Sequence, residues 1–423
     1  MSTSSIPVLI VDDDRTIAAM LQQLIRRLGG GFDCDAVWVA TGAAAREEIK
    51  TGRFHLVLLD YLLPDEDGLA VLASINALPG AERPAVIMLT GAGNEQVAVD
   101  AMKLGARDYI VKTELNFPTL RRSIVTALEH HRLEEKLARS TEELRRKNLE
   151  MDADLALARG VQLALLPQAY PVFPAGGPVD RSALKFCHRW IPSEKVAGDL
   201  FDVFPVGADA AGIFLCDVMG HGVRAALVTA LLRGLVREQI QLADRPGRLL
   251  AAINRGLQTL LGQADDFVFA TAAYVVVEAV TGRVRLATAG HPAPLHLRRR
   301  LGLVTPLVHP DGPGPALGLL PDTSYEELEI LLDPGDAVLL FTDGLFEAAN
   351  VRGEEYGQDR LRIAVTARLA LPTPVFVEEL LADVRAFQSA GGKGFDDDVC
   401  LVAVDRAREW AGPGPGFKAA PVL

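Results

Sequence analysis

The sequence has no long hydrophobic run, few cysteines and no excess of basic charge. No uninterrupted apolar stretch reaches the roughly 20 residues that a membrane-spanning helix needs, and the acidic residues 12–14 come too early for a signal peptide. The four cysteines lie far apart, without the spacing of a metal site or the density of a disulfide-rich domain. We therefore expect a cytoplasmic protein with reduced thiols and no membrane segment.

Basic residues are outnumbered by acidic ones. The chain has 43 Lys and Arg residues against 55 Asp and Glu residues, which gives a formal net charge of −12. Proteins that bind nucleic acid usually present a basic face, so this balance and the lack of a basic recognition helix argue against a DNA-binding output. The 423 residues are 49% hydrophobic and 23% charged, as in ordinary globular proteins, and show no internal repeat. This length predicts two or three domains.

The first 120 residues alternate short apolar runs with helical patterns, which predicts a doubly wound α/β domain with a parallel sheet. In such a sheet, functional groups gather where the strands end. Each predicted strand ends in polar residues that this rule places on one rim of the sheet: Asp12 and Asp13, Asp60, Thr90, and Lys112.

The chemistry of these side chains points to a phosphoryl group. Three crowded carboxylates repel one another, so a divalent cation is needed to keep them all ionised. A lysine beside them can pair with an added phosphoryl group, and a threonine hydroxyl can donate a hydrogen bond to it. This segment resembles the receiver domain of bacterial two-component response regulators along its whole length.

The resemblance implies a role for each residue. Asp60 would accept a phosphoryl group from a cognate sensor histidine kinase, while Asp12 and Asp13 would hold Mg²⁺ with Asp60 and the carbonyl of Leu62. Thr90 and Lys112 would contact the phosphoryl group, and Tyr109 would reorient with it. The sequence departs from the family pattern at Thr113, which follows Lys112 where the family usually has proline.

Residues 121–167 have a different character. Leucine and similar residues recur among charged ones, several of them seven apart, which predicts one long helix with a partial coiled-coil seam that ends before Pro167. The other core register holds Ser140, Lys147 and Asp154, so the seam is weak in the middle. We favour a signalling helix that pairs two chains in a homodimer, with a monomeric spacer as the alternative.

Residues 168–405 are rich in strand-like runs, interrupted by helical patterns at 225–240, 248–260 and 375–387. Antiparallel hairpins with flanking helices predict an α+β sandwich, and residues 276–284 form a clear hairpin signal. The last segment, 406–423, is rich in glycine and proline, and we expect a flexible tail without chemistry.

Four aspartate sites in this third region each lie against an apolar strand. They are Asp199 in 197–202, Asp217 in 216–222, Asp343 in 341–350, and Asp397 and Asp398 in 395–399. Carboxylates at the ends of buried strands are suited to hard cations. A pair of cations can activate a bridging water and hold phosphoryl oxygens for in-line attack, and the sequence shows no obvious activated Cys or Ser nucleophile.

These stretches and the run 289–294 resemble the PPM (PP2C-like) serine/threonine phosphatases, specifically the branch of bacterial stage II sporulation protein E and sigma-factor regulators. The resemblance implies two Mn²⁺ or Mg²⁺ ions, held by Asp199, Asp217, the carbonyl of Val218, Asp343 and either Asp397 or Asp398. It also implies a phosphoserine or phosphothreonine protein substrate, and we expect an anti-sigma-factor antagonist. Ala197 stands where the family commonly has the first of two glycines.

Several interpretations stay open from the sequence. Three consecutive aspartates permit a shift of one residue, although we favour Asp397 over Asp398 as the ligand. His221 is interpreted as a polar residue at a helix start, with a proton donor to the leaving oxygen as the alternative, and His291 as a residue that positions its loop. The whole chain is interpreted as a response regulator whose Asp60 phosphorylation controls a phosphatase. The alternative is a non-enzymatic adaptor with a phosphatase-like binding domain.

Overall fold

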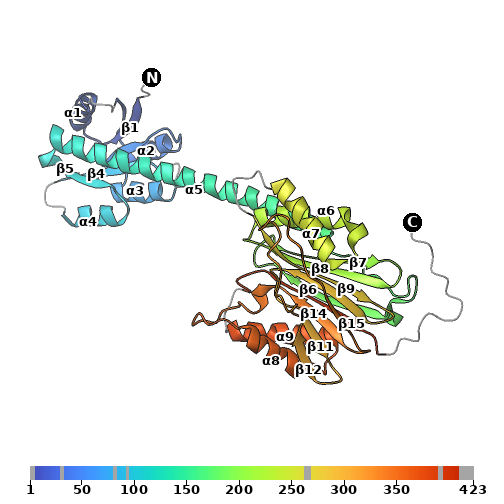
Figure 1. Cartoon of the computed structure of the whole chain (residues 1–423). Helices are drawn as coiled ribbons and strands as arrows, with labels where there is room; N and C mark the ends of the chain where they lie inside the picture. The colour runs from blue at the N-terminus through green and yellow to red at the C-terminus, as the bar shows by residue number, and fades with distance from the viewer. Residues whose placement is uncertain are drawn as a thin grey trace. The chain divides into compact units, whose positions relative to one another are not determined.

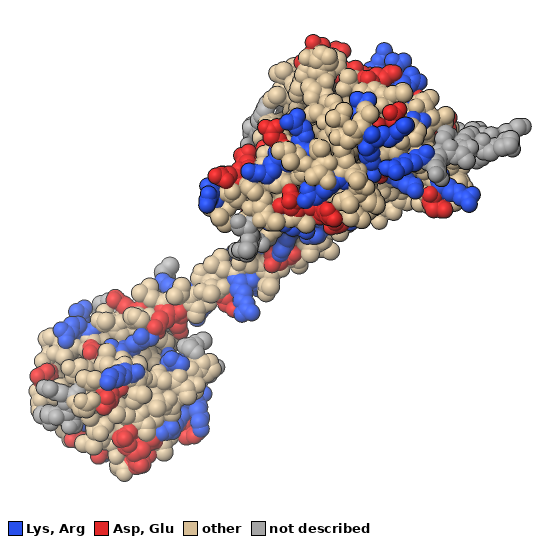
Figure 2. Space-filling view, turned by 90° about the horizontal axis from the view of Figure 1, so that it is seen from below, with Lys and Arg blue, Asp and Glu red and all other residues tan. Residues whose placement is uncertain are grey.

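The computed structural model describes residues 5–28, 33–79, 83–91, 95–261, 268–388 and 394–408 (Figure 1). The chain divides into an N-terminal unit, residues 1–150, and a C-terminal unit, residues 151–423. Within the described ranges, no helix combines the length and the apolar character that crossing a bilayer would require. On the face of each unit seen in Figure 2, acidic and basic side chains are interspersed.

The N-terminal unit is built on a five-stranded parallel sheet with the strand order β2-β1-β3-β4-β5. This confirms the predicted alternation of strands and helices. The strands are β1 (Ile6–Val11), β2 (Cys34–Val39), β3 (Leu56–Asp60), β4 (Ala85–Thr90) and β5 (Asp108–Val111). The helices between them are α1 (Arg15–Arg26), α2 (Gly42–Ile49), α3 (Gly68–Asn76) and α4 (Glu95–Lys103).

Both faces of this sheet are buried, because successive side chains of a strand point to opposite faces. Val8 and Ile10 of β1 pack with residues of α1 and of the start of α5. Leu9 and Val11 pack on the other face with residues of α2 and α3. The fully apolar strands of the sequence are therefore the central strands of a sheet covered on both sides.

The predicted linker is one helix, α5 (Phe117–Leu165), of 49 residues. Its first turns belong to the N-terminal unit, where Leu120 and Ile124 are buried. In the middle of the helix the seam residues are exposed: the exposed fraction is 68% for Leu137 and 60% for Leu144. The helix is confirmed, whereas the pairing of two chains stays a prediction.

The C-terminal unit contains two antiparallel five-stranded sheets, in the orders β13-β10-β9-β8-β7 and β12-β11-β14-β15-β6. The strands of the first sheet are β7 (Asp199–Val206), β8 (Ala210–Val218), β9 (Ala270–Glu278), β10 (Arg283–Ala289) and β13 (Leu328–Leu331). Those of the second are β6 (Leu184–Ile191), β11 (Leu295–Arg298), β12 (Leu303–Pro306), β14 (Ala337–Phe341) and β15 (Val399–Arg406). The predicted hairpin is present, with Val277 of β9 paired with Val284 of β10.

The sheets form a sandwich between two pairs of helices, as Figure 1 shows. Val338 and Leu340 of β14 lie in the core between the two sheets. Leu339 and Phe341 point to the other face of their sheet, into a second core beneath α8 and α9. The helices are α6 (Val223–Glu238), α7 (Pro246–Leu261), α8 (Gln358–Ala367) and α9 (Thr373–Gln388). The predicted α+β sandwich is confirmed, and α8 is a helix that the sequence pattern did not indicate.

The predicted tail falls mostly outside the described residues, which end at 408. Strand β15 extends through Arg406, whose guanidinium donates hydrogen bonds to the carbonyls of Leu332 and Val280. The packed C-terminal unit therefore includes this first residue of the predicted tail.

Candidate functional site

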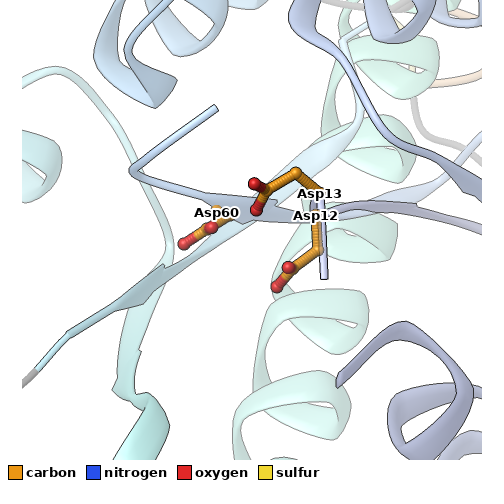
Figure 3. A group of neighbouring side chains, drawn as sticks. All are labelled: Asp12, Asp13 and Asp60. Carbon is orange, nitrogen blue, oxygen red and sulfur yellow. The ribbon is translucent and has the colours of Figure 1, made fainter. Parts of the chain in front are cut away.

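The first candidate site lies at the strand ends of the N-terminal sheet (Figure 3). Asp12 and Asp13 follow β1, and Asp60 is the last residue of β3. One carboxylate oxygen of each residue lies within 4.8 Å of the others, with Asp12 and Asp60 buried and Asp13 exposed. The sequence prediction that these three residues converge on one rim is confirmed.

Lys112 lies in the same cluster and neutralises part of its charge. Its Nζ is 2.9 Å from Asp12 Oδ2 and 2.8 Å from Asp60 Oδ2. Burial raises the pKa of Asp60, and the ion pair with Lys112 only partly offsets this. Burial favours the neutral form of Lys112, but its two carboxylate partners outweigh that effect and raise its pKa. The lysine is therefore held as a cation beside the predicted phospho-acceptor.

The remaining predicted residues surround this cluster. Thr90 ends β4 and is buried, and it pairs in register with Val111, the residue before Lys112. The backbone N–H of Leu62 donates a hydrogen bond to the Asp60 carboxylate, while the Leu62 side chain is exposed. Tyr109 is 44% exposed, so its ring is not buried against the sheet.

The second candidate site is a cavity of about 440 Å³ in the C-terminal unit. It lies where strands and loops distant in sequence meet. Three of the predicted ligands, Asp217, Asp343 and Asp397, line it. The other lining residues are Ser193, Glu194, Met219, Gly220, His221, Phe269, Thr271 and Asp396.

The fourth aspartate, Asp199, lies beside Asp217, because β7 and β8 pair these two residues directly in register. Its Oδ2 accepts a hydrogen bond of 2.7 Å from the Thr342 hydroxyl, while its buried Oδ1 has no hydrogen-bond partner among the described residues. Burial, followed by the charge of Asp217, raises the pKa of Asp199 well above its usual range. A buried carboxylate oxygen without a partner fits a position for a cation.

Burial, and after it mutual repulsion, governs the electrostatics of the carboxylates in this cavity. Burial and then the neighbouring Asp343 raise the pKa of Asp217 to about 7. Burial and then Asp397 raise the pKa of Asp343, and burial raises that of Asp397. Because each carboxylate is hard to ionise beside the others, the donor set fits cations that neutralise them together.

Asp397 and Asp398 differ in what their side chains contact. Asp398 is buried, and its Oδ1 accepts hydrogen bonds from the backbone N–H and the hydroxyl of Ser193, at 2.7 and 2.9 Å. Its Oδ2 accepts a bond of 2.6 Å from Gly198 N–H. Asp397 lines the cavity instead. The arrangement favours Asp397 as the ligand and gives Asp398 the role of joining two loops.

Close backbone contact brings these loops together. A Cβ atom on Gly344 would lie 2.2 Å from the carbonyl oxygen of Asp398, so only glycine fits beside Asp343. A Cβ atom on Gly198 would lie 2.9 Å from the carbonyl oxygen of Val218. The two glycines therefore let the aspartate loops approach one another.

The two histidines have different surroundings. His221 lines the cavity one residue before Gly222, the N-cap of α6, and its Nδ1 lies 3.0 Å from Glu194 Oε1. His291 is buried and hydrogen-bonds to the Thr271 hydroxyl at 2.8 Å, and burial lowers its pKa to about 3. A neutral, buried His291 next to a cavity residue agrees with its predicted positioning role.

Sequence reasoning missed several residues of this cavity. Thr342 joins Asp199 to β15, since its hydroxyl also accepts a 2.8 Å hydrogen bond from Cys400 N–H. Glu194 and Thr271 lie in segments without an aspartate motif. Thr342 alone had a local signal, because it precedes Asp343 at the end of an apolar strand.

The two acidic clusters differ in size. In the part of the chain that the structure describes, three carboxylates with all ligand atoms within 4.8 Å of one another occur at Asp12, Asp13 and Asp60. The second cluster surrounds a wider space. Two ions in a bridged pair lie roughly 3.5–4 Å apart, so their ligands spread further than those of one ion.

Comparison with known families assigns both units. The family described as response regulator receiver domain matches residues 8–125, and the family of stage II sporulation protein E (SpoIIE) matches residues 207–407. The SiaA-PP2C domain of Pseudomonas aeruginosa superposes with a TM-score of 0.52 at 23% identity. This match covers 61% of the chain and 97% of that domain, and it supports the PP2C-like fold.

Curated relatives match one part of the chain or the other. The phosphoserine phosphatase RsbP of Bacillus subtilis is 25% identical over 253 residues, which are 60% of this chain and 57% of RsbP. The transcriptional regulatory protein ZraR of Escherichia coli is 35% identical over 132 residues, 31% of this chain and 28% of ZraR. The chain thus spans between about a quarter and somewhat over half of these relatives. The chain therefore joins a response regulator receiver domain, matched over residues 8–125, to a PP2C-like domain of the stage II sporulation protein E family, matched over residues 207–407.

Proposed function

We propose that this response regulator is a metal-dependent protein serine/threonine phosphatase controlled by phosphorylation of Asp60. The observation that carries the proposal is the convergence of Asp217, Asp343 and Asp397 on one cavity, next to the unpartnered oxygen of Asp199. Structural carboxylates are normally paired with cations or hydrogen-bond donors, whereas these raise one another's pKa.

In this proposal, Asp199, Asp217, the carbonyl of Val218, Asp343 and Asp397 hold two Mn²⁺ or Mg²⁺ ions. When bound, such a pair supplies a metal-activated water and positive charge for the phosphoryl oxygens. Thr342 orients Asp199 through its hydroxyl, and Asp398 fixes the Ser193 and Gly198 loops. The thiols of Cys216 and Cys400 take no part as nucleophiles, because burial raises their pKa and keeps them protonated.

The receiver would accept its phosphoryl group on Asp60 from a cognate sensor histidine kinase. Asp12, Asp13, Asp60 and the carbonyl of Leu62 fit one Mg²⁺ ion, because three carboxylates lie within bonding reach of a common point. Lys112 already pairs with Asp60, so it is placed to pair with a phosphoryl group there, and Thr90 would donate its hydroxyl.

The substrate that we propose is a phosphoserine or phosphothreonine protein, an anti-sigma-factor antagonist in particular. Support comes from RsbP and RsbU of Bacillus subtilis, which are phosphoserine phosphatases by name. The open, acidic cavity suits a phosphate presented on the surface of another protein, since cations would compensate its charge. Pairing of two chains through the exposed seam of α5 belongs to the same proposal.

The test is hydrolysis of a phosphoserine protein by the full chain with Mn²⁺, with Mg²⁺ and with a chelator. Asp217→Asn and Asp343→Asn should each abolish the activity while the far-ultraviolet circular dichroism stays unchanged. An inactive wild type that still binds a partner protein tightly would favour the alternative adaptor. Full, metal-dependent activity in both variants would show that the ligands are misassigned.

A further inference from the structure

A second cavity of the C-terminal unit lies away from the acidic one. Its volume is about 1100 Å³, and the two cavities have no lining residue in common. It borders β6, which stands at the edge of its sheet and pairs with β15. β15 begins next to Asp398 and ends at Arg406, which lines the second cavity, and a strand of 8 residues spans roughly 25 Å. We call this cavity the edge groove, bordered by Tyr170, Phe186, Lys185, Asp405 and Arg408.

One part of the edge groove is lined by aromatic rings and prolines. The rings of Tyr170 and Phe186 stack on one another, with centroids 5.1 Å apart and 30° between their planes. The hydroxyl of Tyr170 hydrogen-bonds to His188 Nδ1, which fixes the ring. The prolines of the lining are Pro171, Pro372 and Pro374. Rigid rings of this kind suit a flat apolar group.

The charge in the edge groove is opposite in sign to that of the whole chain. Its basic lining residues are Lys185, Arg299, Arg406 and Arg408, and its acidic ones are Asp180 and Asp405. Basic groups are thus in excess here, whereas the chain has a formal net charge of −12. Such a local excess attracts an anion to this groove although the chain as a whole repels one.

Asp405 is already bound within the protein. Its Oδ1 accepts a hydrogen bond of 2.7 Å from the Thr373 hydroxyl, and Arg299 Nη2 lies 3.3 Å from the same oxygen. Arg299 also donates hydrogen bonds to the Thr373 hydroxyl and to the carbonyl of Leu371. Burial raises the pKa of Asp405, while Thr373, then Arg299 and last Lys185 act to lower it. Arg299 and Thr373 therefore hold this carboxylate, and Lys185 contributes little to it.

Two cations of the edge groove are left for a ligand. The side chains of Lys185 and Arg408 are exposed, and across the described ranges neither makes a hydrogen bond or an ion pair. The stem of Arg408 lies against a turn, because a Cβ atom on Gly335 would lie 2.9 Å from Arg408 Cγ. The guanidinium of Arg406, in contrast, is occupied by two backbone carbonyls. An anionic group that enters the groove can therefore pair with Lys185 and Arg408.

We propose that the edge groove binds a small organic anion with a flat apolar body, of the class of the aromatic carboxylates. The anionic group pairs with Lys185 and Arg408, and the body lies on the rings of Tyr170 and Phe186. The volume of about 1100 Å³ is close to the upper end of the range for small-molecule sites, roughly 300–1000 Å³. The inference does not depend on the proposed function, because no proposed metal ligand takes part. Binding should therefore need no metal.

The probe is naphthoate, an aromatic carboxylate, compared with its neutral amide naphthamide and with acetate. Binding to the full chain is titrated by saturation-transfer-difference NMR, once in a chelator and once with saturating Mn²⁺. The double variant Lys185→Gln, Arg408→Gln removes the two available cations. The control is Arg248→Gln with Arg255→Gln, which removes the same charge from exposed positions of α7 outside the groove.

Naphthoate should bind the wild type with a Kd on the order of 1 mM or below, as expected for a ligand of its size. Naphthamide and acetate should each bind more weakly, because one lacks the charge and the other the apolar body. The double variant at Lys185 and Arg408 should bind naphthoate about 3- to 30-fold more weakly, since two exposed ion pairs are lost, and naphthamide as before. The control variant should bind all probes as the wild type does, and Mn²⁺ should change none of the affinities.

Naphthoate binding that requires Mn²⁺ would assign the anion to the metal site and overturn the inference. Equal affinity for naphthoate and naphthamide would overturn it too, as would unchanged naphthoate affinity in the double variant or no naphthoate binding at all. An acidic peptide that binds this groove where naphthoate does not would replace the small anion by a protein partner. If the double variant does not fold, the single variants decide, and each should weaken naphthoate binding about 2- to 5-fold.

Discussion

Replacing Asp217 by asparagine should have opposite effects on activity and on stability. The exchange keeps the size of the side chain and removes one negative charge from the acidic cavity. Activity should be lost, because a proposed metal ligand loses its charge. In the absence of metal, the same variant should be more stable than the wild type at pH 8, because it no longer buries a charged carboxylate or sets that charge beside Asp343 and Asp397.

The magnitude follows from the pKa of the carboxyl group. Burial and the nearby Asp343 raise the pKa of Asp217 from 3.8 to about 7. Above pH 7 both the folded and the unfolded chain carry the ionised group, and this difference in pKa corresponds to a penalty on the folded state on the order of 4 kcal/mol. The penalty shrinks as the pH falls through 7, where the folded state takes up its proton, and it vanishes near pH 4. Asparagine carries no such penalty at any pH.

Urea unfolding in a chelator, at several pH values between 4 and 8, measures this difference. Trp190 is a local probe, because its indole N–H donates a 3.0 Å hydrogen bond to the Asp199 carbonyl. Trp38 and Trp410 are replaced by phenylalanine, so that the fluorescence reports the phosphatase domain. Asp311→Asn serves as the control, since the Asp311 side chain is 82% exposed and its replacement should leave the urea midpoint unchanged.

Saturating Mn²⁺ should reverse the order of stability, because binding to the folded state stabilises the wild type more than a variant that lacks a ligand. A metal-free variant that is no more stable than the wild type at pH 8 would contradict the reasoning. So would a stability difference that does not change with pH, because it could not come from the ionisation of this group.

Three further outcomes are expected. Beryllofluoride should change the rate of phosphoserine hydrolysis severalfold, and Asp60→Ala should erase that response, whereas equal rates with a receiver shown to bind the mimic would mean that the domains act independently. Light scattering should show that the wild type is a dimer and that the double variant Leu137→Glu, Leu144→Glu is a monomer. A wild type that stays monomeric at all concentrations and in both phosphorylation states would exclude pairing through α5. Because burial lowers the pKa of His291 from 6.5 to about 3, its imidazole is protonated in the unfolded state but neutral in the folded state between these two pH values. Wild-type stability should therefore fall relative to that of His291→Gln, by on the order of 1 kcal/mol per pH unit, and parallel pH profiles would contradict this.

Much of the receiver was predictable because its chemistry follows from local patterns. A parallel sheet places the ends of all its strands on one edge, so four separated motifs ending at Asp12, Asp60, Thr90 and Lys112 had to meet. The spacing of apolar residues along the sequence also predicted the helix α5 and the hairpin around residues 276–284. In the phosphatase domain, the sequence predicted Asp217, Asp343 and Asp397 as ligands, and the structure brings them to one cavity.

Other features have no local signal. The two oxygens of Asp398 are occupied by Ser193 and Gly198, which lie about 200 residues earlier, and three consecutive aspartates look alike in sequence. Gln162 stands on a helix that is mostly exposed, and only the position of Ala197 explains why it is buried. The sequence pattern also missed α8, a short helix of 10 residues whose first half is mostly polar and charged.

The pairing of β6 with β15 has a consequence for how the domain folds. These are the first and last strands of the domain, and the hydrogen bond that joins Ser193 to Asp398 spans 205 positions of the chain. Contacts of such long range close large loops, and they form slowly because the chain entropy must be overcome before they stabilise anything. During synthesis, Asp199 and Asp217 leave the ribosome long before Asp397 and Asp398. We therefore expect the acidic cavity to be assembled only when the last strand docks, which makes metal capture a late event in folding.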